Sequence, residues 1–379
     1  MSWQEVSTMS LRQEFITMVQ HGTVPFSELC RRFQVSRKTG YKWLARFTAH
    51  GTAGLADRSR RPHGSPRRTP VEVEAAVVAL RDTHPAWGGR KLRRRLQDVG
   101  YRDIPAPSTL TAILHRHGRI EAAESPKHTA FTRFEHVAPN QLWQMDFKGH
   151  VALERGRCHP LTVLDDHSRF NLVLRACANE QGETVQAALT EAFRRYGLPE
   201  RMTMDHGSPW GADPAHPLTL VTAWLIRLGI RVSHSRPYHP QTQGKDERFH
   251  RTLAVECLRA QPLRDLAHCQ DCFDGFRDIY NFDRPHEALG LAVPASRYSS
   301  SPRAFPEVLP PIEYGPGDAV RKVQAKGELF YRGQVFRVST ALRGYPVALR
   351  PTPIDGRWAV YFCHHRVTEI DLRSPDEHS

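Results

Sequence analysis

Three acidic residues lie in local contexts that favour one shared site, although they are far apart in the sequence. Asp146 ends the strand-like run QLWQMD, and Asp205 ends a second such run, RMTMD. Glu247 lies in QTQGKDERFHRTL, which is typical of the start of a basic helix. Carboxylates at two strand ends and on a facing helix can converge, so the sequence predicts an α/β core folded around them.

Such a set of carboxylates predicts a site for hard divalent cations. Mg²⁺ and Mn²⁺ prefer oxygen ligands, keep several waters and accept phosphate oxygens as the remaining ligands. Two such ions can activate the attacking oxygen and stabilise the leaving oxygen of an in-line phosphoryl transfer. We therefore expect Asp146, Asp205 and Glu247 to be catalytic and to hold two Mg²⁺ (or Mn²⁺) ions.

The length and the cysteine content indicate the class of protein. A chain of 379 residues predicts several domains. It has no apolar run of the roughly 20 residues that a membrane helix needs, and its first residues lack the basic-then-apolar pattern of a signal peptide. Seven scattered Cys favour reduced thiols. We expect a cytoplasmic protein without a membrane partner, associated with the nucleoid when active.

The positive charge is concentrated near the N-terminus. The chain carries a net charge of +13, and its first 140 residues hold 23 Lys and Arg against 12 Asp and Glu. A basic balance of this kind indicates a polyanionic partner. The N-terminal third is therefore the predicted electrostatic contact with nucleic acid, the alternative being a basic surface that is merely solvated.

Residues 10–50 are predicted to form a helix-turn-helix DNA-binding domain. FSELCRRF and RKTGYKWLARF indicate two short helices joined by a short turn, with Ser27 and Ser36 as N-caps. The second helix of this motif lies in the major groove. The side chains expected to face inward are Tyr41, Leu44 and Phe47. Those expected to face DNA are Arg37, Lys38, Lys42 and Arg46. A helical hairpin with a merely charged outside is the alternative.

Residues 51–70 are rich in Gly, Pro, Ser and Arg, which predicts an extended basic linker that tracks phosphates or the minor groove. Its expected DNA contacts are Arg58, Arg60, Arg61, Arg67 and Arg68.

Residues 71–119 contain three helical segments and are predicted to form a second helix-turn-helix DNA-binding domain, with Ser108 as the N-cap of its last helix. The contacts expected from its basic middle helix are Arg90, Lys91 and Arg94.

The remaining chain predicts a linker and two further domains. Residues 120–140 are the linker. Residues 141–298 begin with three strand-like runs in an antiparallel arrangement and continue with alternating helices and strands, which predicts a mixed α/β sheet. Residues 313–372 alternate apolar and polar side chains between Gly-containing turns, which predicts about five short strands in a small β-barrel domain.

Several phrases together resemble bacterial insertion-sequence transposases with a retroviral-integrase-type catalytic core. They are QMDFKG, VLDDHSRF, MDHGSPW, SRPYHPQTQGKDERFHRTL and YNFDRPHEAL. The resemblance covers residues 10 to about 370 and is strongest over 140–300. It implies an RNase H-like fold with a DDE metal triad. The family motif places its first Asp on Asp146, its second on Asp205 and its Glu on Glu247.

The resemblance also implies an activity. It implies that the chain binds the ends of an insertion sequence and hydrolyses a phosphodiester there to free a 3′-OH. This 3′-OH is then joined directly to target DNA. The implied partners are double-stranded DNA, at the ends and at the target, and further copies of the chain, since two ends must be paired. Two alternatives stay open. One is a catalytically inactive site-specific DNA-binding regulator derived from a transposase, and the other is an RNase H-like nuclease without strand transfer.

Neighbouring residues offer competing assignments. Asp165 and Asp166 also end a strand, but the family pattern places them at a turn beside the site. Asp246 precedes Glu247, and successive helical residues point about 100° apart, so only one of the two can face the metals; the motif favours Glu247. Cys269 and Cys272 are a lone pair on a predicted helix, which favours a thiol pair over a zinc site.

A polar rim is expected around the acids. Its long cationic and polar side chains can clamp phosphates as charge develops on the transferring group. The rim residues predicted to bind DNA are Tyr238, Gln243, Lys245, Arg248 and Arg251. For Arg248 and Arg251 the alternative is a solvated helix face. Trp143, Phe147 and Trp224 are predicted to belong to the core.

Overall fold

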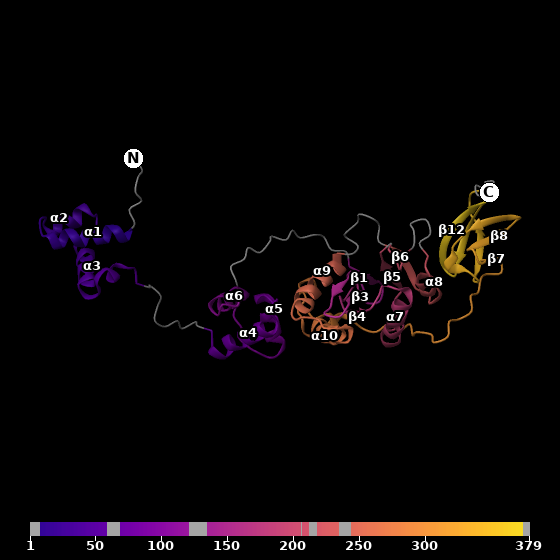
Figure 1. Cartoon of the computed structure of the whole chain (residues 1–379), viewed down its shortest axis with the longest axis horizontal. Helices are drawn as coiled ribbons and strands as arrows, with labels where there is room; N and C mark the ends of the chain where they lie inside the picture. The colour runs from indigo at the N-terminus through magenta and orange to yellow at the C-terminus, as the bar shows by residue number, and fades with distance from the viewer. Residues whose placement is uncertain are drawn as a thin grey trace. The chain divides into compact units, whose positions relative to one another are not determined.

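The computed structural model describes residues 8–58, 69–120, 135–205, 207–211, 218–234 and 244–373. It divides into two compact units, Met1–Arg68 and Thr69–Ser379, each of which is described by itself. The described residues form helices at the N-terminal end, helices with strands in the middle and strands at the C-terminal end (Figure 1). This order confirms the predicted fold class. Within the described ranges no helix is long and apolar enough to cross a membrane.

The first unit is a small helical domain. Its helices are α1 (Thr8–His21), α2 (Phe26–Arg32) and α3 (Arg37–His50). Phe15, Leu29 and Trp43 are buried between them. A Cβ at Gly40 would stand 2.8 Å from Cys30 Sγ, so glycine permits the close approach of α3 to α2. The predicted pair of helices joined by a short turn is present.

The helix starts were predicted with mixed success. Ser36 caps α3, because its Oγ accepts the N–H of Thr39 at 3.1 Å. The prediction of Ser27 as a cap is wrong, since α2 already begins at Phe26. Pro25 precedes that helix, and its carbonyl accepts the first helical N–H groups.

The inward face of α3 also differs from the prediction. Tyr41 is 58% exposed, and its ring stacks on Phe26 with centroids 4.2 Å apart. Trp43 takes the buried position instead, while Leu44 and Phe47 pack partly against the core as expected. The expectation for Tyr41 is wrong because Phe26 of α2 holds its ring on the outer side.

The predicted first linker is partly folded. Gly51–Leu55 forms a 3₁₀ turn, η1, that packs on α1 and α3. Leu55 is buried in the same apolar centre as Trp43. The folded part of the first domain therefore extends past residue 50, and residues 59–68 of the expected linker lie outside the described residues.

The second unit begins with another helical module. Its helices are α4 (Val71–Thr83), α5 (Gly89–Asp98) and α6 (Pro107–Arg116). Val77, Trp87, Leu92 and Leu110 are fully buried among them. Ser108 is not the N-cap of α6, because the helix begins at the preceding proline, whose missing N–H is not needed at a first helical position.

A mixed sheet forms the centre of the second unit. Its strands are β1 (Trp143–Phe147), β2 (Val151–Ala152), β3 (Arg157–Asp165), β4 (Asn171–Cys177), β5 (Arg201–Met204) and β6 (Arg231–His234). The order is β2-β3-β1-β5-β6, with β4 also paired to β3. β3 is antiparallel to β1 and β4, whereas β5 is parallel to β1 and β6. The antiparallel start and the mixed sheet are confirmed, and only the short β2 was not foreseen.

Helices cover both faces of this sheet. They are α7 (Gly182–Tyr196), α8 (Leu220–Arg227), α9 (Gly244–Leu253) and α10 (Leu266–Asp278), with π-helical turns at Ala254–Leu258 and Ile279–Asp283 and 3₁₀ turns at Glu287–Leu289 and Pro294–Arg297. Trp143 and Met145 of β1 pack in the cluster that contains α7 and α8. Side chains alternate along a strand, so Asp146 belongs to the opposite face. α9 contacts β1 there.

The C-terminal residues form two antiparallel sheets. Their strands are β7 (Ala319–Lys322), β8 (Glu328–Tyr331), β9 (Gln334–Arg337), β10 (Pro346–Pro351), β11 (Arg357–Phe362) and β12 (His365–Asp371), with a 3₁₀ turn at Thr340–Leu342. Four strands pair in the order β12-β11-β10-β7, and β8 pairs with β9. Ala223 and Ile226 of α8 join their apolar core. The all-β prediction is confirmed, with one more strand than expected.

Candidate active site

Asp146 and Asp205 lie side by side at the ends of two adjacent parallel strands. Trp143 pairs with Met202 and Gln144 with the next residue of β5. The same register carried forward brings Asp146 opposite Asp205, the first residue after β5. The sheet therefore places both carboxylates at one edge, as the strand-end positions predicted.

The electrostatics of Asp146 reflect this placement. Burial, and then the negative charge of Asp205, raise the pKa of Asp146 from 3.8 to about 7. A bound cation would remove the repulsion between the two carboxylates, and their oxygens are the ligands that Mg²⁺ and Mn²⁺ prefer. The pair therefore fits a divalent ion. Within the described ranges no group of three or more His, Cys, Asp or Glu residues is placed to hold a metal.

The first turn of α9 presents Asp246 and Glu247 in different directions. Asp246 is 2% exposed, whereas Glu247 lies on the exposed side of the helix. Burial, and then the charge of Asp146, raise the pKa of Asp246 well above its usual range, and Asp205 also contributes. Among the described residues its Oδ1 has no hydrogen-bond partner. The acid that α9 turns toward Asp146 is therefore Asp246, next to the residue that the family motif selects.

His250 follows Asp246 by one helical turn and lies on the same face of α9. Its Nε2 is 2.9 Å from Thr162 Oγ1, and its Nδ1 is 3.9 Å from Asp146 Oδ2. Burial, and then the charge of Lys148, lower the pKa of His250 to about 4. A neutral imidazole therefore borders the acid pair.

The polar rim is only partly described. Lys245 is the second residue of α9 and forms an ion pair with Asp166. Arg248 and Arg251 are exposed on the same helix, which suits phosphate contacts and equally a solvated face. Tyr238 and Gln243 lie outside the described residues.

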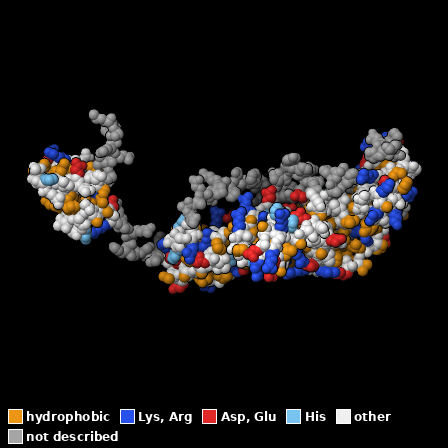
Figure 2. All heavy atoms as spheres, in the orientation of Figure 1, with side chains coloured by type: hydrophobic (Ala, Val, Ile, Leu, Met, Phe, Trp, Pro, Cys, Tyr) orange, Lys and Arg blue, Asp and Glu red, His pale blue; other side chains and the backbone are white. Residues whose placement is uncertain are grey.

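The predicted DNA contacts of the first domain are on its surface. Arg37, Lys38 and Lys42 are exposed on α3. The Arg46 guanidinium lies over the Trp43 ring, 5.0 Å from its centroid. Arg58 is also exposed, and Arg60, Arg61, Arg67 and Arg68 lie outside the described residues. In Figure 2, Lys and Arg side chains are interspersed with Asp and Glu over the visible surface.

The basic helix α5 of the second module has a different arrangement. Arg90 is exposed, and Arg94 pairs with Asp98 on its own helix. Burial, and then the charge of Arg284, lower the pKa of Lys91 to about 8. Lys91 therefore lies near charged residues of the core, such as Arg284, although it was predicted to bind DNA.

Two polar contacts fix this arrangement. The Arg95 guanidinium pairs with Asp283. The Trp87 indole N–H donates to Glu256 at 3.2 Å, and Glu256 is held in turn by Arg284. Ile279 packs against the apolar centre of the module. One face of the module is thus directed at the core.

Comparison with protein families accounts for most of this architecture. Two models described as integrase core domain match residues 136–240 and 228–294. A homeodomain-like domain and a helix-turn-helix domain match residues 39–114 and 11–63. The C-terminal domain of the IS481 family transposases matches residues 318–378. The chain has the domains of a bacterial insertion-sequence transposase with an integrase-type core.

Individual relatives agree with this assignment. The chain is 26% identical over 272 residues to an uncharacterized 39.2 kDa protein of insertion element IS476 from Xanthomonas euvesicatoria, and the match covers 70% of this chain and 75% of that protein. It is 27% identical over 178 residues to a 31.7 kDa protein of insertion element IS407 from Burkholderia multivorans, covering 45% of this chain and 62% of that protein.

A solved structure, the simian T-cell lymphotropic virus intasome in complex with PP2A regulatory subunit B56 gamma, matches with 14% identity and a TM-score of 0.38. The match covers 78% of this chain and 96% of that chain.

The cysteines of the chain are all free. Cys269 Sγ lies 3.7 Å from Cys158 Sγ in the core. Cys272 Sγ lies 3.8 Å from His268 Nε2 on the same helix. Cys269 and Cys272 thus have separate partners and do not form a pair with each other.

Proposed function

We propose that this chain is a metal-dependent DNA transposase that cleaves the ends of its insertion sequence and joins the freed 3′-OH to target DNA. The observation that carries the proposal is the pair of carboxylates, Asp146 and Asp205, at one edge of the integrase-core sheet beside α9. Their burial and mutual repulsion favour a bound divalent cation. The partners in this proposal are double-stranded DNA and further copies of the chain.

The residues around the acid pair have separable roles in this proposal. Two Mg²⁺ ions, when bound, would polarise the phosphodiester and stabilise the charge that develops on it. Asp146 and Asp205 hold them, and Glu247 completes the set when DNA is bound. His250 stays neutral and keeps water from one side of Asp146. Lys245, Arg248 and Arg251 lie on α9, where cationic side chains can hold phosphate oxygens.

The third acid is the point on which the motif and the geometry differ. The motif selects Glu247, which is exposed and free to approach DNA, whereas Asp246 is the buried acid near Asp146. Because a ligand for a DNA-bound ion must reach the open side of the site, we assign the role to Glu247. Asp246 then remains a buried neighbour of Asp146 outside the metal-binding set.

A joining assay tests the function and this assignment together. A donor DNA fragment with the native flanks of the gene is incubated with a supercoiled target in Mg²⁺ and then in Mn²⁺. Wild type, Glu247→Gln and Asp246→Asn are compared, and binding to the flanks is measured for each. We expect joined products from wild type, none from Glu247→Gln despite intact binding, and reduced but measurable joining from Asp246→Asn.

The other outcomes have defined meanings. Activity in Glu247→Gln together with none in Asp246→Asn would transfer the third-acid role to Asp246. Nicks without joined products would favour a nuclease. Binding to the flanks without either product would favour an inactive DNA-binding regulator.

A further inference from the structure

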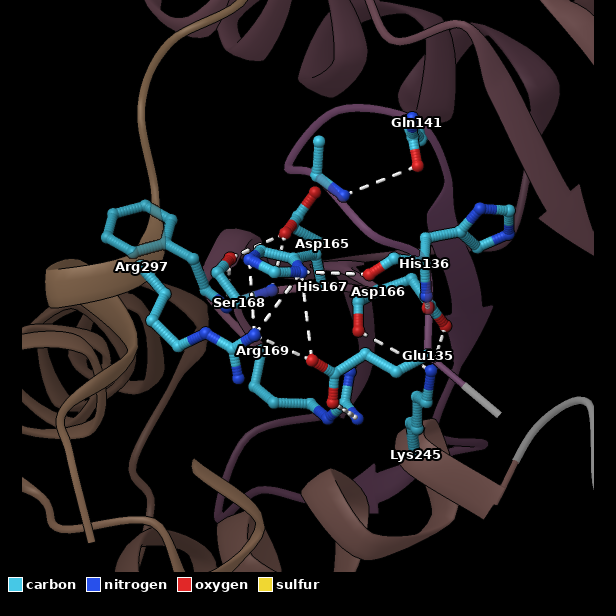
Figure 3. A network of polar contacts seen from close by, with 12 residues as sticks. Glu135, His136, Gln141, Asp165, Asp166, His167, Ser168, Arg169, Lys245 and Arg297 are labelled. Carbon is cyan, nitrogen blue, oxygen red and sulfur yellow. Dashed lines mark hydrogen bonds and ion pairs between the residues drawn. The ribbon is translucent and has the colours of Figure 1, made fainter. Parts of the chain in front are cut away.

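Asp166 is a buried carboxylate that binds three separate segments of the core. It directly follows β3 and is 2% exposed. Its Oδ2 accepts the backbone N–H of His136 at 2.9 Å. Its Oδ1 accepts the Gln144 side-chain amide at 2.9 Å and also pairs with the Lys245 ammonium. Figure 3 shows Asp166 between His136 and Lys245.

The donors lie next to the predicted metal ligands along the chain. Gln144 stands two residues before Asp146 on β1, and side chains two apart share one face of a strand. Lys245 stands two residues before Glu247 in the first turn of α9. One carboxylate thereby connects the strand that carries Asp146 to the start of the helix that carries the third acid.

The third donor connects Asp166 to the segment that enters the core. His136 precedes β1, and its neighbour Glu135 pairs with Arg169 and Arg297. The backbone N–H of Asp166 also donates to the carbonyl of Leu142 at 2.9 Å, just before β1 begins. The entry of the chain, β1 and α9 are therefore held at one point.

The adjacent Asp165 has a different set of partners. It is fully buried. Its Oδ1 accepts the N–H and the hydroxyl of Ser168, and its Oδ2 accepts the N–H of Asn140. These bonds hold the turn after β3 and the segment before β1, and none of them reaches α9. Asp166 therefore differs from Asp165 in accepting from Gln144 of β1 and pairing with Lys245 of α9.

We propose that Asp166 is a positioning residue that sets the start of α9 relative to β1, and through them the separation of the metal-binding acids. This inference rests on the proposed metal-dependent function. Removing a carboxylate from such a site leaves the buried ammonium of Lys245 without its counter-charge, so that the first turn of α9 moves to solvate it. Partners that bond a metal ligand directly typically change metal affinity by about 10–100-fold when they are removed, and Asp166, which acts through Gln144 and Lys245, is expected at the low end of that range.

The test uses the full-length chain bound to a DNA duplex of its native flanks, because Glu247 completes the site only on DNA, and it measures metal binding with the duplex alone as the blank. Mn²⁺ is titrated into wild type, Asp166→Asn and Asp165→Asn, and the free ion is followed by electron paramagnetic resonance. Thermal melting is recorded for each variant. We expect Asp166→Asn to weaken Mn²⁺ binding by about 10-fold or more, whereas Asp165→Asn, the matched control, lowers the melting temperature and keeps the wild-type affinity.

A second variant covers the case in which Asp166→Asn does not fold. Lys245→Gln keeps a hydrogen-bond donor for Asp166 and removes only the ion pair, and the same weakening of Mn²⁺ binding is expected. Equal affinities in wild type, Lys245→Gln and every folded Asp166 variant would overturn the inference. So would equal weakening in Asp165→Asn and Asp166→Asn, because the effect would then follow stability alone.

The same titration separates this inference from the proposed function. Wild type that binds Mn²⁺ but neither nicks nor joins its flanking DNA would refute the transposase proposal. The comparison of Asp166→Asn with Asp165→Asn would still decide the role of Asp166. Wild type that binds no Mn²⁺ in the presence or absence of DNA would overturn both.

Discussion

Each of the two helical modules has one helix rich in basic residues, α3 in the first and α5 in the second, but the two helices use these residues differently. On α3 of the first unit, Arg37, Lys38 and Lys42 point into solvent. On α5 of the second module, Lys91 is largely buried and Arg95 pairs with Asp283 of the core. A basic helix thus indicates an anionic partner without saying whether that partner is DNA or a carboxylate of the same chain.

This difference indicates that the two modules have different roles in DNA binding. The first unit is compact by itself, and the exposed cations of α3 can reach phosphates and bases. The second module belongs to the same compact unit as the core. We infer that the first module supplies most of the sequence reading, and that the second places its own DNA contacts, such as Arg90, at a fixed position relative to the active site.

The largest expected effect is on stability. Trp87 is fully buried and its indole also bonds to Glu256. Trp87→Ala should destabilise the second unit by about 3–5 kcal/mol. Trp43→Ala should instead affect the first unit, because the two tryptophans belong to separate units. Differential scanning calorimetry of the full chain measures both transitions.

A single transition that shifts equally in both tryptophan variants would contradict the division. The variant Trp87→Phe refines the comparison, since it keeps most of the packing and removes only the bond to Glu256. It should cost about 1 kcal/mol.

The second effect is on DNA affinity. Arg37→Ala or Lys42→Ala removes an exposed cation of α3, and each should weaken binding to the insertion-sequence ends by about 1–3 kcal/mol if it contacts a base. If it contacts a phosphate, the slope of log affinity against log salt should fall by about one. Lys91→Ala, the matched change on α5, should alter neither quantity. Fluorescence anisotropy at several salt concentrations measures both.

Comparable losses from Lys42→Ala and Lys91→Ala would show that the second module reads DNA in the same way as the first, and that its contact with the core opens on binding.

The third effect is a dependence of stability on pH. Burial lowers the pKa of Lys91 from 10.5 to about 8, so between these values the unfolded chain binds more protons than the folded chain. Stability of the second unit should therefore rise with pH above about 8, by at most about 1.4 kcal/mol per pH unit. Lys91→Met, which cannot titrate, should flatten this rise. Urea unfolding at pH 8, 9 and 10 measures it, with Lys38→Met on the first unit as the control.

Much of the fold and part of the site could be predicted because their signals are local. The strand-like runs that end in Asp146 and Asp205 predicted that these two acids lie together, because adjacent parallel strands bring their carboxyl ends to the same side of a sheet. The position of Tyr41 was not predictable from α3 alone, because Phe26 of another helix decides it.

The remaining differences depend on distant partners. Helical periodicity shows that Asp246 and Glu247 point apart, but the phase that buries Asp246 is set by packing of α9 on the sheet. The contact of Arg95 with Asp283 spans 188 residues of sequence, and that of Trp87 with Glu256 spans 169. A local sequence pattern cannot predict which distant residues pair. A single sequence shows only that suitable partners for Arg95 and Trp87 are present.

The smallest expected effect tests the contact between module and core most directly. Arg95 and Asp283 are partly exposed, so their pair contributes about 1 kcal/mol or less. Arg95→Glu should destabilise the second unit by a similar amount, and adding Asp283→Arg should restore most of the loss because the charges are then complementary again. Restoration in a urea-unfolding double-mutant cycle isolates the pair from every other role of Arg95.

The matched cycle on Arg94 and Asp98, which pair within α5 itself, provides the control. It should show a coupling of about 0.3–0.5 kcal/mol. If the Arg95 and Asp283 reversals restore joining as well as stability, the orientation of the second module on the core is part of the active assembly. If they restore stability while joining stays lost, Arg95 must contact DNA in the active complex. The basic helices of both modules would then bind DNA, and the pairing of Arg95 with Asp283 would belong to the DNA-free protein alone.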